Sequence, residues 1–259
     1  MKRLLLKMNE NYISIRENVR LISLGIAFFL STIVDNYYFA LTWILHLLII
    51  LNIRRIGGEN VMTYFIRVSG YFIHLGMFSL LYNRVKIVND KIGISLIIMV
   101  ISLIIYFYSH FNELRIKLSI FNISRMTIKY SKSKYLTLMY NQVGAAICEE
   151  LYFRFLIIEL FEKLNYFSIL ISAVYFVLFH YTLNWGSKFK IREYMEQFII
   201  GLILSTIYYL SKNIFLPILM HSLINFPILY LMARLYHRDY INPKFYIDSE
   251  KDDFDELII

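Results

Sequence analysis

The sequence has a single cysteine, Cys148, among its 259 residues. One thiol cannot form an internal disulfide framework and cannot supply a multi-cysteine metal site, so both classes of small stapled fold are excluded. A catalytic cysteine needs a histidine beside it. We interpret Cys148 instead as a small apolar packing residue.

Charged residues are also scarce, since they make up 18% of the chain. A soluble domain normally has about a quarter charged and about half apolar residues, whereas this chain is 58% hydrophobic. The charges fall between long apolar runs, and runs of about 20 residues with few charges are typical of transmembrane helices. The sequence therefore predicts an all-α, polytopic membrane protein without a large soluble domain.

A compact basic domain is absent, although the formal net charge is +8. The basic residues lie in the gaps between the apolar runs, where lysine and arginine set the orientation of a membrane protein. A nucleic-acid partner would need these charges gathered on one patch or stripe, so we expect no nucleic acid to bind.

We predict about eight spans that form a transmembrane helix bundle. The first two are separated only by Asp35 and Asn36, so they form either a tight hairpin or one long bent helix. A single helix would move every later loop to the other side of the membrane. The approximate ranges of the spans are 21–34, 37–53, 61–82, 92–110, 136–160, 166–183, 195–211 and 213–235.

The distribution of lysine and arginine predicts which loops face the cytoplasm. With the N-terminus inside, most of the 27 Lys and Arg residues lie in inside segments. We therefore expect a multi-pass protein of the cell membrane with both termini in the cytoplasm. The outside loops hold only Arg84, Lys86, Lys91, Lys163 and Lys212.

The chain divides into three parts. Residues 1–134 contain the first helices and a basic cytoplasmic loop, in which 112–134 is interpreted as an amphipathic helix on the inner leaflet. Residues 135–235 form a second group of helices. Residues 236–259 form an acidic tail that we expect to be mobile.

The stretch CEELYFRF places Glu149, Glu150 and Arg154 inside one apolar span. A charge at the centre of such a helix costs about 2.5–3.5 kcal/mol on insertion scales and tends to be functional. Glu150 and Arg154 are four residues apart, so they share a helix face and can pair, whereas Glu149 is rotated by about 100°. Either all three form a structural ion cluster, or Glu150 and Arg154 pair and leave Glu149 free to act.

Two later spans add polar groups at helical spacing. His180 lies four residues after Phe176, and His221 lies four residues before Asn225. A lone histidine in a membrane usually joins helices by a hydrogen bond, and we interpret His46 and His74 in that way. A glutamate, two histidines and an asparagine on three helices would instead form a pocket with a base and hydrogen-bond donors.

These residues resemble the CAAX amino-terminal protease family, also called CPBP or Abi. The family has three motifs on separate helices, and here they occur in the same order over about residues 135–230. That part of the chain would be its catalytic region. The motifs are Glu149-Glu150-x-x-x-Arg154, Phe176-x-x-x-His180 and His221-x-x-x-Asn225.

The resemblance implies a membrane-embedded endopeptidase that cleaves a membrane-associated peptide or protein. Glu149 would be the general base, and His180 would help to orient the attacking water. His221 and Asn225 would hold the oxyanion of the tetrahedral intermediate, while the other two charged residues of the first motif would support the site. Bacterial members of the family are associated with the maturation of pheromones or bacteriocins and with bacteriocin immunity.

The resemblance leaves a metal cofactor open. Glu149, His180 and His221 would supply the three protein ligands of a catalytic zinc ion, and the family is often labelled a metalloprotease. The helical HExxH arrangement is absent, and we favour water activated by glutamate without a metal.

Two other classes of function remain. The first is a non-catalytic immunity factor or scaffold that binds a partner through its helices. The second is a transporter, which would use the same intramembrane charges as an ion relay. Inverted repeats with broken helices would indicate a transporter, and the sequence shows no repeat of this kind.

Overall fold

The computed structural model describes residues 2–53, 55–56, 60–82, 90–182 and 190–243, and for residues 2–16 it describes only the backbone. These residues form helices and no strand, so the all-α prediction is confirmed. Of the predicted mobile tail, residues 244–259 lie outside the described part of the chain.

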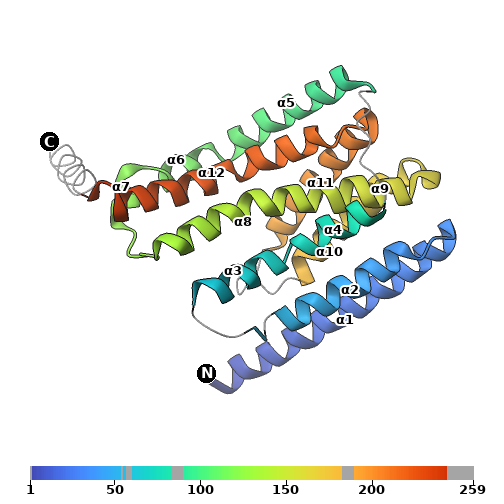
Figure 1. The fold of residues 1–259 in the computed structure, drawn as a ribbon, viewed down its shortest axis with the longest axis horizontal. Helices are drawn as coiled ribbons and strands as arrows, with labels where there is room; N and C mark the ends of the chain where they lie inside the picture. The colour runs from blue at the N-terminus through green and yellow to red at the C-terminus, as the bar shows by residue number, and fades with distance from the viewer. Residues whose placement is uncertain (1, 54, 57–59, 83–89, 183–189, 244–259) are drawn as a thin grey trace.

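The described helices follow one another in a bundle (Figure 1). They are α1 (Lys2–Val34), α2 (Tyr38–Ile53), α3 (Val61–Gly70), α4 (Ile73–Tyr82), α5 (Ile92–Ser109), α6 (Phe111–Lys117), α7 (Ile120–Arg125), α8 (Lys132–Glu150), the π-helix η1 (Leu151–Leu156), α9 (Ile157–Leu160), the 3-10 helix η2 (Glu162–Leu164), α10 (Phe167–Thr182), α11 (Ile191–Ser211) and α12 (Phe215–Tyr240).

The first two helices form the tight hairpin rather than one bent helix. Asp35 turns the chain with a positive φ of 54°, a conformation that aspartate tolerates better than most residues. Asn36 accepts a hydrogen bond from the backbone N–H of Tyr38 at 3.0 Å, which starts α2. The two helices then pack side by side (Figure 1).

The predicted count of eight spans is not confirmed. By length and composition, three of the described helices can cross a membrane, within Glu17–Val34, Ile92–Ser109 and Phe215–Tyr240. A fourth span is possible if the bent pair α3 and α4, with 44° between the helices, counts as one. The apolar helices α2 and α10 have only 16 residues each, which is at the short end of what a bilayer needs.

The basic loop 112–134 is not one amphipathic helix. Ser119 begins the separate helix α7 by accepting a hydrogen bond from Asn122 N. The guanidinium of Arg238 on α12 then binds the carbonyl oxygens of Ile123, Met126 and Ile128, which fixes the chain after α7 in a non-helical path. Two short helices therefore precede α8.

The helix formed by α8, η1 and α9 runs through the middle of the bundle. In Figure 1, α8 lies between α12 on one side and α3 and α4 on the other, and all three contact it. Residues 152–158 are all buried. The charged residues of CEELYFRF therefore lie in the packed centre of the protein.

Helix α10 is held against this central helix from two sides. On one side, Arg20 of α1 donates to the carbonyl of Thr182 at 2.9 Å, and the hydroxyl of Tyr175 donates to the carbonyl of Ser23 at 2.8 Å. On the other side, Gly201 of α11 lies so close to α10 that a Cβ atom there would meet the Cα of Ala173 at 3.3 Å. The position of α10 matters because it carries His180.

Candidate active site

Glu150 is the centre of a fully buried ion cluster. Its Oε2 lies 3.0 Å from Nε of Arg154, so the predicted pair is present. Its Oε1 accepts a hydrogen bond from Nδ1 of His221 at 2.7 Å, a contact that sequence spacing does not reveal. Glu150 therefore joins the end of α8 to both η1 and α12.

The positive charge of Arg154 is balanced by the nearby carboxylate of Glu150 and not by aligned hydrogen bonds. The short approach to Glu150 is not aligned as a hydrogen bond, and both terminal nitrogens are buried without a hydrogen-bond partner in the described residues. The guanidinium lies over the ring of Phe176, 4.4 Å from its centroid. A cation over an aromatic face is favourable, more so in a desolvated place.

Glu149 faces a different histidine. Its Oε2 lies 3.9 Å from Nε2 of His180, which is beyond the range of a direct hydrogen bond. Nδ1 of His180 lies 2.8 Å from the carbonyl oxygen of Phe176 and must donate to it. In the neutral ring, Nε2 is then a lone-pair acceptor. Two acceptors face each other across a gap that a water molecule can bridge by donating to both.

The ring of Phe176 contacts both histidines and Arg154. Its ring centroid lies 4.5 Å from that of His180 and 6.1 Å from that of His221. The motif spacing identifies Phe176 but does not predict a role for it. The structure places its ring against Arg154 and its carbonyl on His180, so the residue orients both.

Asn225 is less closely integrated than the other motif residues. Its Nδ2 donates to the carbonyl of Gln142 on α8 at 3.5 Å, which is a weak hydrogen bond. It lies one turn after His221 on α12, as the spacing predicts. Among the described contacts, none joins Asn225 to Glu149 or His180.

The three residues that the resemblance permits as zinc ligands, Glu149, His180 and His221, lie in two neighbouring contacts. Nδ1 of His221 is turned to Glu150, whereas His180 is turned to Glu149. In the described part of the chain, no group of three or more His, Cys, Asp or Glu residues is placed to hold a metal ion.

The two other intramembrane histidines join helices, as predicted. Nδ1 of His46 on α2 lies 2.7 Å from Nε2 of His74 on α4. Nδ1 of His74 in turn lies 2.9 Å from the carbonyl of Gly70. Since His74 must donate to that carbonyl, His46 is the donor in the contact between the rings.

Cys148 packs between helices. Its side chain is partly buried against the apolar cluster around Leu75 and Tyr152. A Cβ atom added to Gly76 on α4 would meet its Sγ at 2.9 Å, so the glycine makes room for the thiol. This position agrees with a packing residue rather than a nucleophile.

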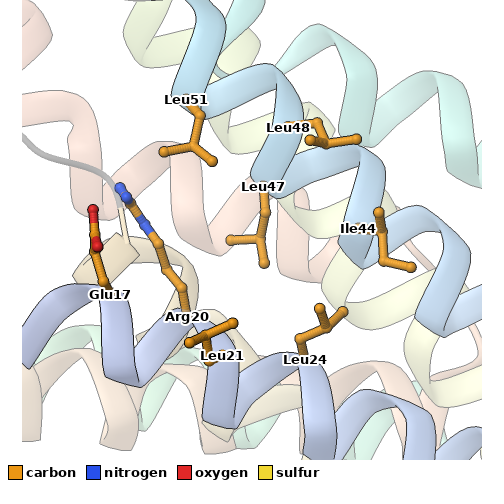
Figure 2. A pocket seen from close by; sticks show the side chains of 8 residues that line it. All are labelled: Glu17, Arg20, Leu21, Leu24, Ile44, Leu47, Leu48 and Leu51. Atoms are coloured by element: carbon orange, nitrogen blue, oxygen red, sulfur yellow. The ribbon is translucent and has the colours of Figure 1, made fainter.

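A cavity of about 370 Å³ lies away from these residues, between α1 and α2 (Figure 2). Its wall is mainly leucine, with Glu17 and Arg20 at one end. No residue of the three motifs lines it. The cavity is therefore separate from the cluster of acids and histidines, although Arg20 also contacts the end of α10.

Comparison with known families supports the motif reading. Residues 131–227 match the family model described as Rce1-like, type II CAAX prenyl endopeptidase Rce1-like. This range contains all three motifs, so the predicted resemblance is confirmed there. The match supports an intramembrane CAAX-type endopeptidase with a peptide or protein substrate. No curated protein and no solved structure matches the chain.

Proposed function

We propose that the chain is an intramembrane endopeptidase in which Glu149 activates water to hydrolyse a peptide bond. The observation that carries the proposal is the 3.9 Å gap between Glu149 Oε2 and His180 Nε2. Both atoms are hydrogen-bond acceptors when Glu149 is ionised and His180 is neutral. A water between them would donate both protons and turn a lone pair of its oxygen outward, towards a substrate carbonyl.

The attack then follows from general base catalysis. Glu149 takes one proton as the water oxygen bonds to the carbonyl carbon, and the carbonyl electrons move to oxygen to give the tetrahedral intermediate. When the carbon–nitrogen bond breaks, the proton on Glu149 passes to the leaving amine. Exclusion of bulk water by the surrounding rings strengthens each of these electrostatic interactions.

The oxyanion role of His221 requires a particular protonation state. Its Nδ1 donates to Glu150 at 2.7 Å, so Nε2 can donate to an oxyanion only if the ring carries both protons. Glu150 would then be the counter-ion of the imidazolium, much as a buried carboxylate supports the histidine of a hydrolytic triad. Asn225, one turn further along α12, would supply the second donor.

The substrate in this proposal is a membrane-associated peptide or protein. A bacteriocin or pheromone precursor suits the bacterial members of the family, either for maturation or for immunity. The protein would cross the membrane several times with both termini in the cytoplasm. Reporter fusions to each end test this orientation, and an external signal from either terminus would contradict it.

A comparison of membrane peptides tests the proposed reaction. Cells that express the wild-type chain or Glu149→Gln at equal membrane abundance are compared by mass spectrometry of their membrane peptidomes. We expect products with new termini only in the wild type. If the two peptidomes agree and the variant retains any immunity phenotype, the protein acts by binding and is not a protease.

A further inference from the structure

The helix that carries Glu149 changes its hydrogen bonding directly after the two glutamates. Residues Leu151–Leu156 form the π-helix η1, and the N–H of Ile157 bonds to the carbonyl of Tyr152, five residues back. Such segments are rare and frequently occur at functional sites. A wider turn is less favourable than an α-helical one, so contacts from neighbouring helices must hold it in place.

Two buried serines supply such a contact. The hydroxyl of Ser172 on α10 donates to the carbonyl oxygen of Phe153, inside η1, at 2.7 Å. The hydroxyl of Ser205 on α11 lies 2.8 Å from the same Ser172 oxygen. A hydroxyl has one proton to donate, so Ser205 donates to Ser172 and Ser172 donates to Phe153. Both serines are 0% exposed.

Ser172 is one of three residues on a single face of α10 that contact the central helix. Ser172, Phe176 and His180 follow at four-residue intervals and therefore share one face of the helix. The serine holds η1 through Phe153, and the phenylalanine ring lies against Arg154. The histidine faces Glu149. The serine contact is the one of the three that involves no group of the proposed chemistry.

We infer that Ser172 is a positioning residue, whose hydroxyl, oriented by Ser205, fixes the register between α10 and η1 and thereby the gap between Glu149 and His180. This inference rests on the proposed function, because the gap matters only if a water reacts there. A misplacement of about 1 Å can cost about a hundredfold in rate. Loss of the hydroxyl should therefore affect turnover more than substrate binding.

The test uses the full-length protein, purified in detergent, and a precursor that it cleaves in a Glu149-dependent manner. We expect Ser172→Ala to lower kcat by about tenfold to a hundredfold with little change in KM. We expect Ser205→Ala, which keeps the Ser172 hydroxyl, to lower kcat less. Ser168→Ala is the matched control, because Ser168 is equally buried on α10 but its hydroxyl, among the described contacts, donates to the carbonyl of Asn165 just before that helix.

Hydrogen–deuterium exchange gives a second readout that does not depend on cleavage. The amides of residues 151–158 should exchange faster in Ser172→Ala than in the wild type, and should be unchanged in Ser168→Ala. Equal exchange in the wild type, Ser172→Ala and Ser168→Ala would overturn the inference. An unchanged kcat in Ser172→Ala, with the same loss of melting temperature as in Ser168→Ala, would also overturn it. A failure of the proposed function is recognised separately, because then no precursor is cleaved in a Glu149-dependent manner, whereas the exchange comparison of the serine variants can still be made.

Discussion

Two buried polar groups in this protein contain histidines but differ in the distance between their side chains. The histidine pair, His46 and His74, brings its ring nitrogens to 2.7 Å, and the chain of hydrogen bonds ends on the carbonyl of Gly70. In the other group, Glu149 and His180 stay 3.9 Å apart. The pair leaves no room for a water molecule, whereas the glutamate and histidine do.

Burial alone therefore does not separate the polar group that joins helices from the one that we propose to react. His46 is 0% exposed and Glu149 is 5% exposed, so both have left water. The difference lies in the nearest partner. The two histidine rings share one proton directly, whereas Glu149 and His180 face each other as two acceptors with no hydrogen bond between them. Substitutions in each group test this distinction.

Replacement of Glu149 by glutamine should abolish cleavage. The amide is close in size to the carboxylate and adds no charge, so folded abundance should stay near that of the wild type. It cannot accept a proton from water in the attack. Product is measured by mass spectrometry on a processed precursor, and folding by melting in detergent. Normal cleavage by this variant would show that the carboxylate is structural.

Disruption of the Glu150 cluster should mainly reduce stability. Glu150→Gln or Arg154→Ala leaves a buried charge without its partner, which costs about 3–5 kcal/mol. Glu150→Gln also removes the acceptor of His221, so we expect the protein that does fold to turn over more slowly. Unfolding in detergent with a chemical denaturant measures the stability change.

Two controls separate the buried pair from ordinary ion pairs. Glu150→Gln combined with Arg154→Met removes both charges and should recover part of the stability. Glu196→Gln breaks a pair with Arg192 at 2.8 Å, but Arg192 has a side chain that is 77% exposed, so the loss should stay below about 1 kcal/mol. If Glu150→Gln folds well but is inactive while Glu149→Gln cleaves, the roles of the two glutamates are reversed.

The sequence predicts well those contacts of the site that lie within one helix. The four-residue spacing identifies the Glu150–Arg154 pair because one helical turn brings the two side chains together. The same spacing places Phe176 and His180 on one face. The contact between His221 and Glu150 joins residues 71 positions apart, and no spacing rule predicts how α12 is rotated against α8.

The fold class was predictable from composition, but the breaks in the helices were not. Hydropathy is averaged over a window and does not detect the bend between α3 and α4 or the π-helical turn of η1. Both involve contacts between segments that are separate in the sequence: Gly70, at the bend, leaves room for the side chain of Ile53 on α2, and Phe153 gives its carbonyl to Ser172 on α10. The loop after α7 likewise depends on Arg238 from the other end of the chain.

Substitution in the histidine pair should have a small effect on stability and none on cleavage. Hydrogen bonds between membrane helices average about 0.6 kcal/mol and reach about 1.7 kcal/mol. His74→Phe keeps an aromatic ring beside Phe78 and loses the hydrogen bonds to His46 and Gly70. The free energy of unfolding and kcat are measured together. Loss of kcat with normal stability would place this pair in the reaction and erase the contrast with Glu149.

Removal of metal ions should have the smallest effect, because in the proposed reaction Glu149 rather than zinc activates the water. A catalytic zinc ion takes three protein ligands at about 2.0–2.2 Å. Here Nδ1 of His221 binds Glu150 and Nε2 of His180 lies 3.9 Å from Glu149, and no group of three or more His, Cys, Asp or Glu among the described residues is placed to hold a metal ion. We expect cleavage of the precursor to be unchanged after dialysis against EDTA, with the protein's metal content checked by mass spectrometry. Activity that disappears on chelation and returns with stoichiometric zinc would contradict this expectation and would indicate that His221 binds the metal through Nε2 while Glu150 keeps its Nδ1. In that case the contrast between the two histidine groups would rest on a metal ligand set rather than on a bridging water.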